Sequence, residues 1–189
     1  PYTLSLHDAL PILLRNTHNG QIELNVKVES PQFVTTSFGG ADGANDGNVI
    51  TKKCTENEYT TFRYSYNGSY QKDAYITSAS QITDLTGLTN SDLIMLDIQY
   101  ASKLVNLNID DNTKLTALHI NNCTNLETFS AKNCTALTSV LDFNNSKNLK
   151  SIDVSGSGVQ SIICNKCLYL ENINLNSSRI TSYISENSN

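Results

Sequence analysis

Tryptophan is absent from the 189-residue sequence, methionine occurs once, and proline and arginine occur three times each. Charged residues make up 16% of the chain, and the formal net charge is −5. A protein that binds nucleic acid needs a basic surface that neutralises phosphates, and this sequence offers no basic stripe. The longest apolar run is far shorter than the ~20 residues that span a membrane. We therefore expect neither a nucleic-acid partner nor a membrane span in this sequence.

Asparagine, serine, threonine, leucine and isoleucine dominate the composition. Strong helix formers are scarce and β-branched residues are abundant, which favours strands joined by tight turns. The motifs of phosphate-binding loops, serine hydrolases and zinc proteases are absent, and no pair of carboxylates is spaced for acid–base chemistry. We therefore expect a mainly β protein that is not an enzyme and holds no cofactor or metal.

A repeat begins at Ile82, from which the sequence divides into units of ten to twelve residues. Most units fit the pattern L-x-x-L-x-I-x-x-N/C, as in LTALHINNC at residues 115–123. Leu118 and Ile120 are two residues apart, so a strand directs both side chains to one side. Leu115 joins them from the preceding turn. Each unit has only a thin apolar edge, so the units must stack to bury a shared core.

This pattern resembles the leucine-rich repeat family, and within it the short bacterial type that includes the internalins. The resemblance covers residues 82–189. It implies a solenoid in which two units form one coil of about 21–22 residues. The side chains expected inside the coils include those of Leu104, Leu118, Ile152 and Ile173. The last unit lacks a polar capping segment, so we expect the repeat to continue in the natural protein.

The cysteines are interpreted through the same repeat. Cys164 and Cys167 have the C-x-x-C spacing of half a zinc ribbon or of a redox pair, but no second pair at matching spacing completes a zinc site. In leucine-rich repeats a cysteine can replace an inward leucine or the asparagine of the pattern. Cys123, Cys134 and Cys167 take asparagine positions and Cys164 an inward one. We therefore predict small buried core residues.

Residues 13–81 have a different sequence pattern, with five short segments separated by turn residues. In QIELNVKV, residues 21–28, apolar and polar residues alternate as in a half-buried strand. The segments predict a small β-sandwich that precedes the solenoid. This sandwich would act as an N-terminal cap by covering the apolar end of the first coil at Ile82 and Leu85.

The stretch from Phe33 to Ser80 is similar to PKD-like sandwiches. The residues that correspond to the two motifs of that family are Phe38, Gly39 and Gly43, then Tyr64, Tyr66 and Tyr75. The tryptophan and the first aspartate of the first motif are absent, and its turn is longer. The loop DGANDG, residues 42–47, lacks two ligands of a calcium loop, so we expect a solvated hairpin loop.

Residues 1–12 are left out of the predicted fold. Tyr2 to Ile12 can be back-translated, codon by codon, into a DNA string that resembles a common sequencing adapter. A short N-terminal strand is the alternative interpretation. The apolar stretch from Ala9 to Leu14 is not typical of a signal peptide, because no basic segment precedes it and no small-residue cleavage site follows.

Two columns of outward side chains are expected along the solenoid. One column is polar and consists of Asn108, Ser130, Asp153 and Asn174. The other consists of Asp97, His119, Leu141, Ile163 and Ile184, and its last three members are apolar. Stacked aliphatic side chains that face water are unusual, so the candidate partner-binding residues are His119, Leu141, Ile163 and Ile184. A shift of register at an extra residue near Leu141 is the alternative explanation.

These features favour a non-catalytic, secreted or surface-displayed bacterial leucine-rich repeat protein that binds a protein or a glycan. One alternative is a structural stalk that displays another domain. A phage tail adhesin built from the same modules is a second alternative. The expected extracellular location follows from the family resemblance.

Overall fold

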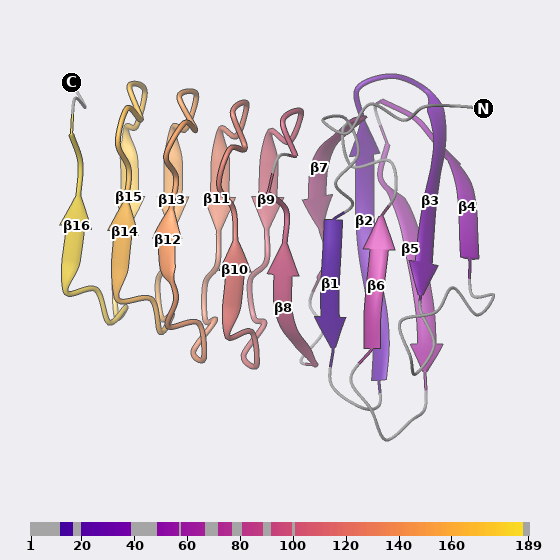
Figure 1. Ribbon diagram of the computed structural model, residues 1–189, viewed down its shortest axis with the longest axis horizontal. Coiled ribbons are helices and arrows are strands. Elements are labelled where there is room, and N and C mark those ends of the chain that lie inside the picture. Colours follow the sequence, from indigo (N-terminus) through magenta and orange to yellow (C-terminus); the bar gives the residue numbers. More distant parts are fainter. Residues whose placement is uncertain are drawn as a thin grey trace.

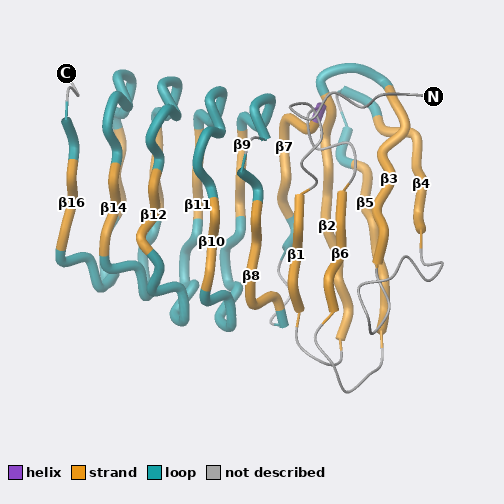
Figure 2. Tube along the Cα trace, viewed as in Figure 1, coloured by secondary structure: helices purple, strands orange, loops and turns teal. Residues whose placement is uncertain are grey.

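The computed structural model describes residues 12–16, 20–38, 49–56, 58–66, 72–76, 81–88, 92–99 and 101–186. In these residues the protein is mainly β, with almost no helix. The N-terminal strands lie at one end, and the coils formed by the later strands stack in a row away from them (Figure 1). Turns form the two long margins of this row, and the strands run between the margins (Figure 2).

The N-terminal strands include all five segments expected before the repeat. The first eight strands are β1 (Ile12–Asn16), β2 (Gly20–Val28), β3 (Gln32–Phe38), β4 (Val49–Cys54), β5 (Thr60–Tyr66), β6 (Lys72–Ile76), β7 (Ile82–Thr86) and β8 (Leu93–Asp97). The alternation expected in β2 is confirmed, because Leu24, Val26 and Val28 are buried whereas Lys27 is partly exposed. One face of this strand therefore contributes to the core.

The repeat forms a β-solenoid of about four turns. Its later strands are β9 (Asn106–Asn108), β10 (Ala117–His119), β11 (Thr128–Ser130), β12 (Val140–Asp142), β13 (Ser151–Asp153), β14 (Ser161–Ile163), β15 (Asn172–Asn174) and β16 (Ser182–Ile184). Strands β7, β9, β11, β13 and β15 pair in parallel on one side of the coils. This register stacks equivalent positions of successive coils, so their apolar edges form one continuous core.

The inward positions are buried as expected, except in the last coil. Leu104, Leu118 and Ile152 are at most 3% exposed. Ile173 is 37% exposed because it lies on β15, the end strand of its sheet. The apolar edge of one coil thus needs the next coil to cover it.

Two of the three sheets to which the solenoid strands belong continue into the N-terminal strands. The strand orders are β15-β13-β11-β9-β7-β2-β5 and β10-β8-β1-β6-β3-β4. Strand β2 pairs antiparallel with β7, and β1 pairs antiparallel with β8. Ile82 and Leu85 are fully buried, so paired strands cover the first coil. The ranges 13–81 and 82–189 therefore share two sheets.

The PKD-like identity of the N-terminal part stays a prediction. Gly39, Gly43 and most of the loop tested as a calcium site lie outside the described residues. Phe38, Tyr64 and Tyr66 lie on β3 and β5, but their side chains are also outside the description.

The last residue that was left out of the predicted fold, Ile12, belongs to a strand. Ile12 begins β1, pairs with Ile76 of β6 and is 1% exposed. Leu14 of the same strand is fully buried. This agrees with the alternative of an N-terminal strand from Ile12 onward, and residues 1–11 lie outside the described part.

The turns share one backbone conformation. A left-handed residue with φ between 56° and 71° occurs at Asp111, Asn122, Asn133, Asn145, Gly156, Lys166 and Ser177. Glycine and asparagine tolerate this conformation best. The residue that follows occupies the Asn or Cys position of the repeat and is buried at Asn112, Cys123, Cys134, Ser146, Ser157 and Cys167. Asn112 Nδ2 donates to the carbonyl of Ile109 at 2.8 Å, which satisfies a backbone group inside the turn.

The prediction that Leu141 faces outward is wrong. Leu141 is fully buried, and the neighbouring Val140 is 51% exposed. The unit that begins at Leu137 has one extra residue, and the chain absorbs it before β12. Leu141 consequently pairs with Ile162, and Asp142 pairs with Ile163. The register shift given above as the alternative is therefore present. At this point the sheet breaks, and β12, β14 and β16 form a separate sheet.

Candidate functional site

The four residues predicted to bind a partner do not form one column. His119 is about half exposed, and its Nδ1 lies 3.3 Å from Asp97 Oδ2. Leu141 belongs to the core. Ile163 and Ile184 face outward and pair with each other on β14 and β16. Ile184 is 43% exposed and Ile163 is partly exposed. These two residues are called the isoleucine pair below.

Most outward residues at strand ends have a structural task that the sequence analysis missed. At five of them a side-chain oxygen accepts the N–H of the residue two places later, which closes the turn. These capping positions hold Asp97, Asn108, Asp142, Asp153 and Asn174, with N···O distances of 2.8–3.2 Å. The recurrence of Asp or Asn at this position was a usable signal in the sequence. The isoleucine pair occupies the same position in two adjacent coils and offers no acceptor.

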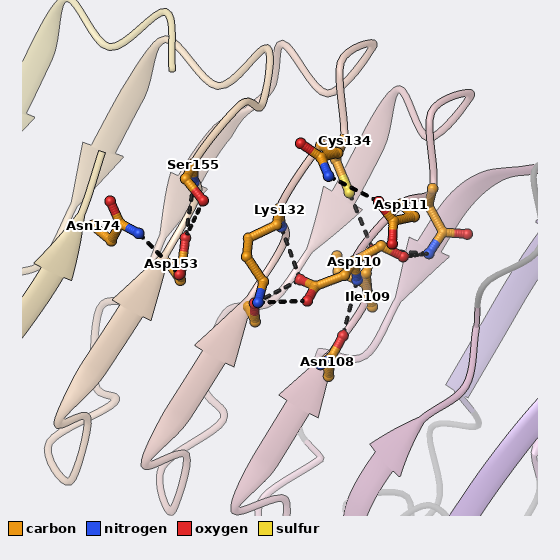
Figure 3. A network of polar contacts seen from close by, with 12 residues as sticks. Asn108, Ile109, Asp110, Asp111, Lys132, Cys134, Asp153, Ser155 and Asn174 are labelled. Carbon is orange, nitrogen blue, oxygen red and sulfur yellow. Dashed lines mark hydrogen bonds and ion pairs between the residues drawn. The ribbon is translucent and has the colours of Figure 1, made fainter. Parts of the chain in front are cut away.

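Polar contacts connect neighbouring coils along the sheet that contains β9, β11, β13 and β15 (Figure 3). Asp110 Oδ1 accepts from Ser130 Oγ at 2.6 Å and from the N–H of Lys132 at 2.8 Å. Lys132 Nζ lies 3.2 Å from Asp110 Oδ2, and this hydrogen-bonded carboxylate raises the pKa of Lys132. Asn133 Nδ2 donates to Asp111 Oδ1 at 2.9 Å. The outward side chains here therefore bind one another.

Asp153 both caps its own turn and contacts the next coil. Its Oδ1 accepts from the N–H and Oγ of Ser155 at 3.0 and 2.7 Å, and its Oδ2 accepts from Asn174 Nδ2 at 3.1 Å. Burial by itself would raise the pKa of Asp153. The hydrogen bonds from Ser155 and Asn174 and the charge of Lys132 outweigh it, so the pKa is lowered.

We expect the charge of Asp153 to stabilise the fold except in acid. Because the folded pKa lies below the ordinary 3.8, the unfolded chain binds this proton more tightly. The contribution is thus present above the unfolded pKa and lost as pH falls through the folded pKa. Asp153→Asn retains an acceptor for Ser155 but has no charge to lose. Circular dichroism between about pH 5 and pH 2 should show a smaller loss of stability in this variant. Equal acid sensitivity would contradict the assignment.

A shallow polar groove of about 320 Å³ lies on the turns that follow β12, β14 and β16. It is lined by Asn144, Asn145, Asn165, Lys166 and Glu186. Asn165 and Glu186 come two residues after the isoleucine pair. The groove therefore begins within two residues of the pair along the chain, at the turns that follow β14 and β16. The groove was not predicted from the sequence, since its residues lie about one coil apart along the chain.

The cysteines are buried, as predicted from the repeat. Burial raises the pKa of the Cys123 and Cys134 thiols to about 12, so both stay protonated at neutral pH. Cys164 and Cys167 form a disulfide that the sequence analysis did not predict. Asn165 and Lys166, two residues of the groove, lie between these cysteines. Within the described part of the chain, no group of three or more His, Cys, Asp or Glu residues is placed to hold a metal ion.

Comparison with known proteins gave no match to any family model, curated protein or solved structure. The described residues contain no helix of the length and apolar character needed to cross a membrane.

Proposed function

We propose that this chain is a non-catalytic, extracellular solenoid of the leucine-rich repeat type that binds a protein or glycan partner through the isoleucine pair. The observation that carries the proposal is the loss of the cap at two adjacent coils. Asp or Asn holds the corresponding position in five other turns. Isoleucine offers no acceptor at this position and leaves apolar surface in water, so its presence there is best explained by a partner that covers it.

Local chemistry around the pair supports a surface used for contact. The N–H of Glu186 bonds to Asn165 Oδ1 of the preceding coil at 2.9 Å, so its turn is held by another residue and Ile184 is not needed for it. Val140, also exposed, lies on the same sheet. The disulfide between Cys164 and Cys167 favours an oxidising compartment, which is consistent with an extracellular location.

The double variant Ile163→Asn/Ile184→Asn tests this proposal. Asparagine holds the equivalent position on β9 and β15, so the melting temperature should stay equal or rise. Binding should fall about tenfold or more, as when an apolar contact at the centre of an interface is lost. The measurement is surface plasmon resonance against purified extracellular-matrix proteins and a glycan array.

Phe33→Asn is the matched control, because it removes an apolar side chain that is 65% exposed on β3, a strand of a different sheet from the pair. This variant should bind as the unaltered protein does. Equal binding by the double variant would contradict the proposed surface.

The stalk is the second candidate, and the polar contacts between side chains of successive coils favour it. Thr128 Oγ1 donates to Asn106 Oδ1 at 2.6 Å, and Lys150 Nζ lies 2.7 Å from Glu127 Oε2. These contacts stiffen the stack, and they bond the side chains to one another instead of to a partner. If the unaltered protein binds nothing in either panel, the stalk is the better account.

A further inference from the structure

We infer that the polar groove on the turns after β12, β14 and β16 is a binding site for a neutral saccharide. This inference rests on the proposed function and names the ligand class at the surface beside the isoleucine pair. Three consecutive turns contribute, with Asn144 and Asn145 from one, Asn165 and Lys166 from the next, and Glu186 from the last. The site therefore exists only when the coils are stacked.

The groove is held in shape by bonds that do not use all of its polar groups. The N–H of Lys166 donates to the carbonyl of Glu186 at 3.1 Å, and Asn145 Nδ2 donates to Asn122 Oδ1 at 3.0 Å. The disulfide on either side of Asn165 and Lys166 restricts the turn that presents them. A fixed turn loses little conformational entropy when a ligand binds, which increases affinity.

Several groups in the groove have hydrogen-bonding capacity left over. Asn144 Oδ1 is buried from solvent and has no hydrogen-bond partner, although it is an amide acceptor at the groove wall. A buried polar atom without a partner is uncommon in folded proteins, and rotation of the Asn144 amide toward a ligand is one way to satisfy it. Among the described residues, neither the Lys166 ammonium nor the Glu186 carboxylate forms a salt bridge.

The mixture of groups identifies the ligand chemistry. Three amides, one ammonium and one carboxylate supply donors and acceptors, and their formal charges cancel. A phosphate or nucleic acid requires excess positive charge, and a hard cation requires several carboxylate oxygens. A hydroxyl both donates and accepts, so a polyhydroxylated neutral ring satisfies both kinds of group. The isoleucine pair lies only two residues before Asn165 and Glu186 along the chain, so a ligand that extends beyond the groove can also bury apolar surface.

The test uses the full chain with its disulfide intact and an array of neutral and anionic oligosaccharides. We expect retention on neutral oligosaccharides, with less than about twofold change between 0.15 and 0.5 M NaCl, because the groove has no net charge to screen. Asn144→Ala and Glu186→Gln should each reduce binding about tenfold. Asn144→Ala removes no acceptor that the fold uses, so its melting temperature should not fall.

Asn121→Ala is the matched control, since Asn121 holds the position of Asn144 one coil earlier and does not line the groove. It should leave saccharide binding unchanged. Absence of binding to every neutral saccharide, preference for anionic ones, or full binding by Asn144→Ala would each overturn the inference. Loss of saccharide binding with protein binding retained would leave the proposed function standing.

Discussion

Leu141→Glu is expected to unfold the middle of the solenoid and lower the melting temperature by about 10 °C or more. Leu141 is fully buried on β12 and pairs with Ile162 of β14, in the layer of side chains that fills the coils. Glutamate there loses the burial of the leucine and places an unpaired carboxylate among apolar groups. Together these effects cost about 4 kcal/mol or more, a large part of the stability of a typical domain.

Val140→Glu is the matched control, because it changes the adjacent residue, whose side chain is half exposed. Its effect should stay within about 0.5 kcal/mol, as for most surface substitutions. Thermal unfolding followed by circular dichroism compares the two variants. The outward orientation predicted from the sequence requires the opposite, with Leu141→Glu as stable as the unaltered protein. That outcome would show that the register described here is incorrect.

Gly158→Ala is expected to destabilise the solenoid by about 3 kcal/mol, the upper range for overpacking. A Cβ at Gly158 would collide with the carbonyl oxygen of Thr135 and approach that of Leu137 to 3.1 Å. Both atoms belong to the backbone of the preceding coil. The N–H of Gly158 bonds to the carbonyl of Cys134 at 3.0 Å, which holds the two turns close together. Neither turn can move away from the other without breaking this hydrogen bond between the coils.

Gly156→Asn separates this crowding from a general intolerance of the turn. Gly156 has φ +67°, close to the values at Asn122 and Asn145, so asparagine suits its backbone. A Cβ there would meet Asn133 Oδ1, the end of a side chain that can rotate. We expect a change below about 1 kcal/mol. Urea unfolding midpoints give both values, and equal effects of the two variants would contradict the packing explanation.

The periodic spacing of apolar residues predicted the solenoid because each strand is short and local. In LTALHI, alternation alone places Leu118 and Ile120 on one side, and no distant residue can change that preference. The cysteines were predicted to be buried for the same reason, since their position in the repeat fixes their side. The strands β2 to β6 were likewise visible as short segments separated by turn residues, and β2 also by its alternation. The identity of the N-terminal part and the role of the chain were not contained in these patterns.

Stacking of the coils determined the features that the sequence pattern did not predict. The extra residue of the unit at Leu137 could enter at several places, and packing of Leu141 on Ile162 selected one of them. The groove depends on Asn144, Asn165 and Glu186, which come together only because the coils lie one strand spacing apart. The sequence by itself determined that thin apolar edges must stack into coils. The tertiary structure decided the register at β12, the pairing of two solenoid sheets with β1 and β2, and the composition of the groove. Each depends on contacts between residues from different coils or strands.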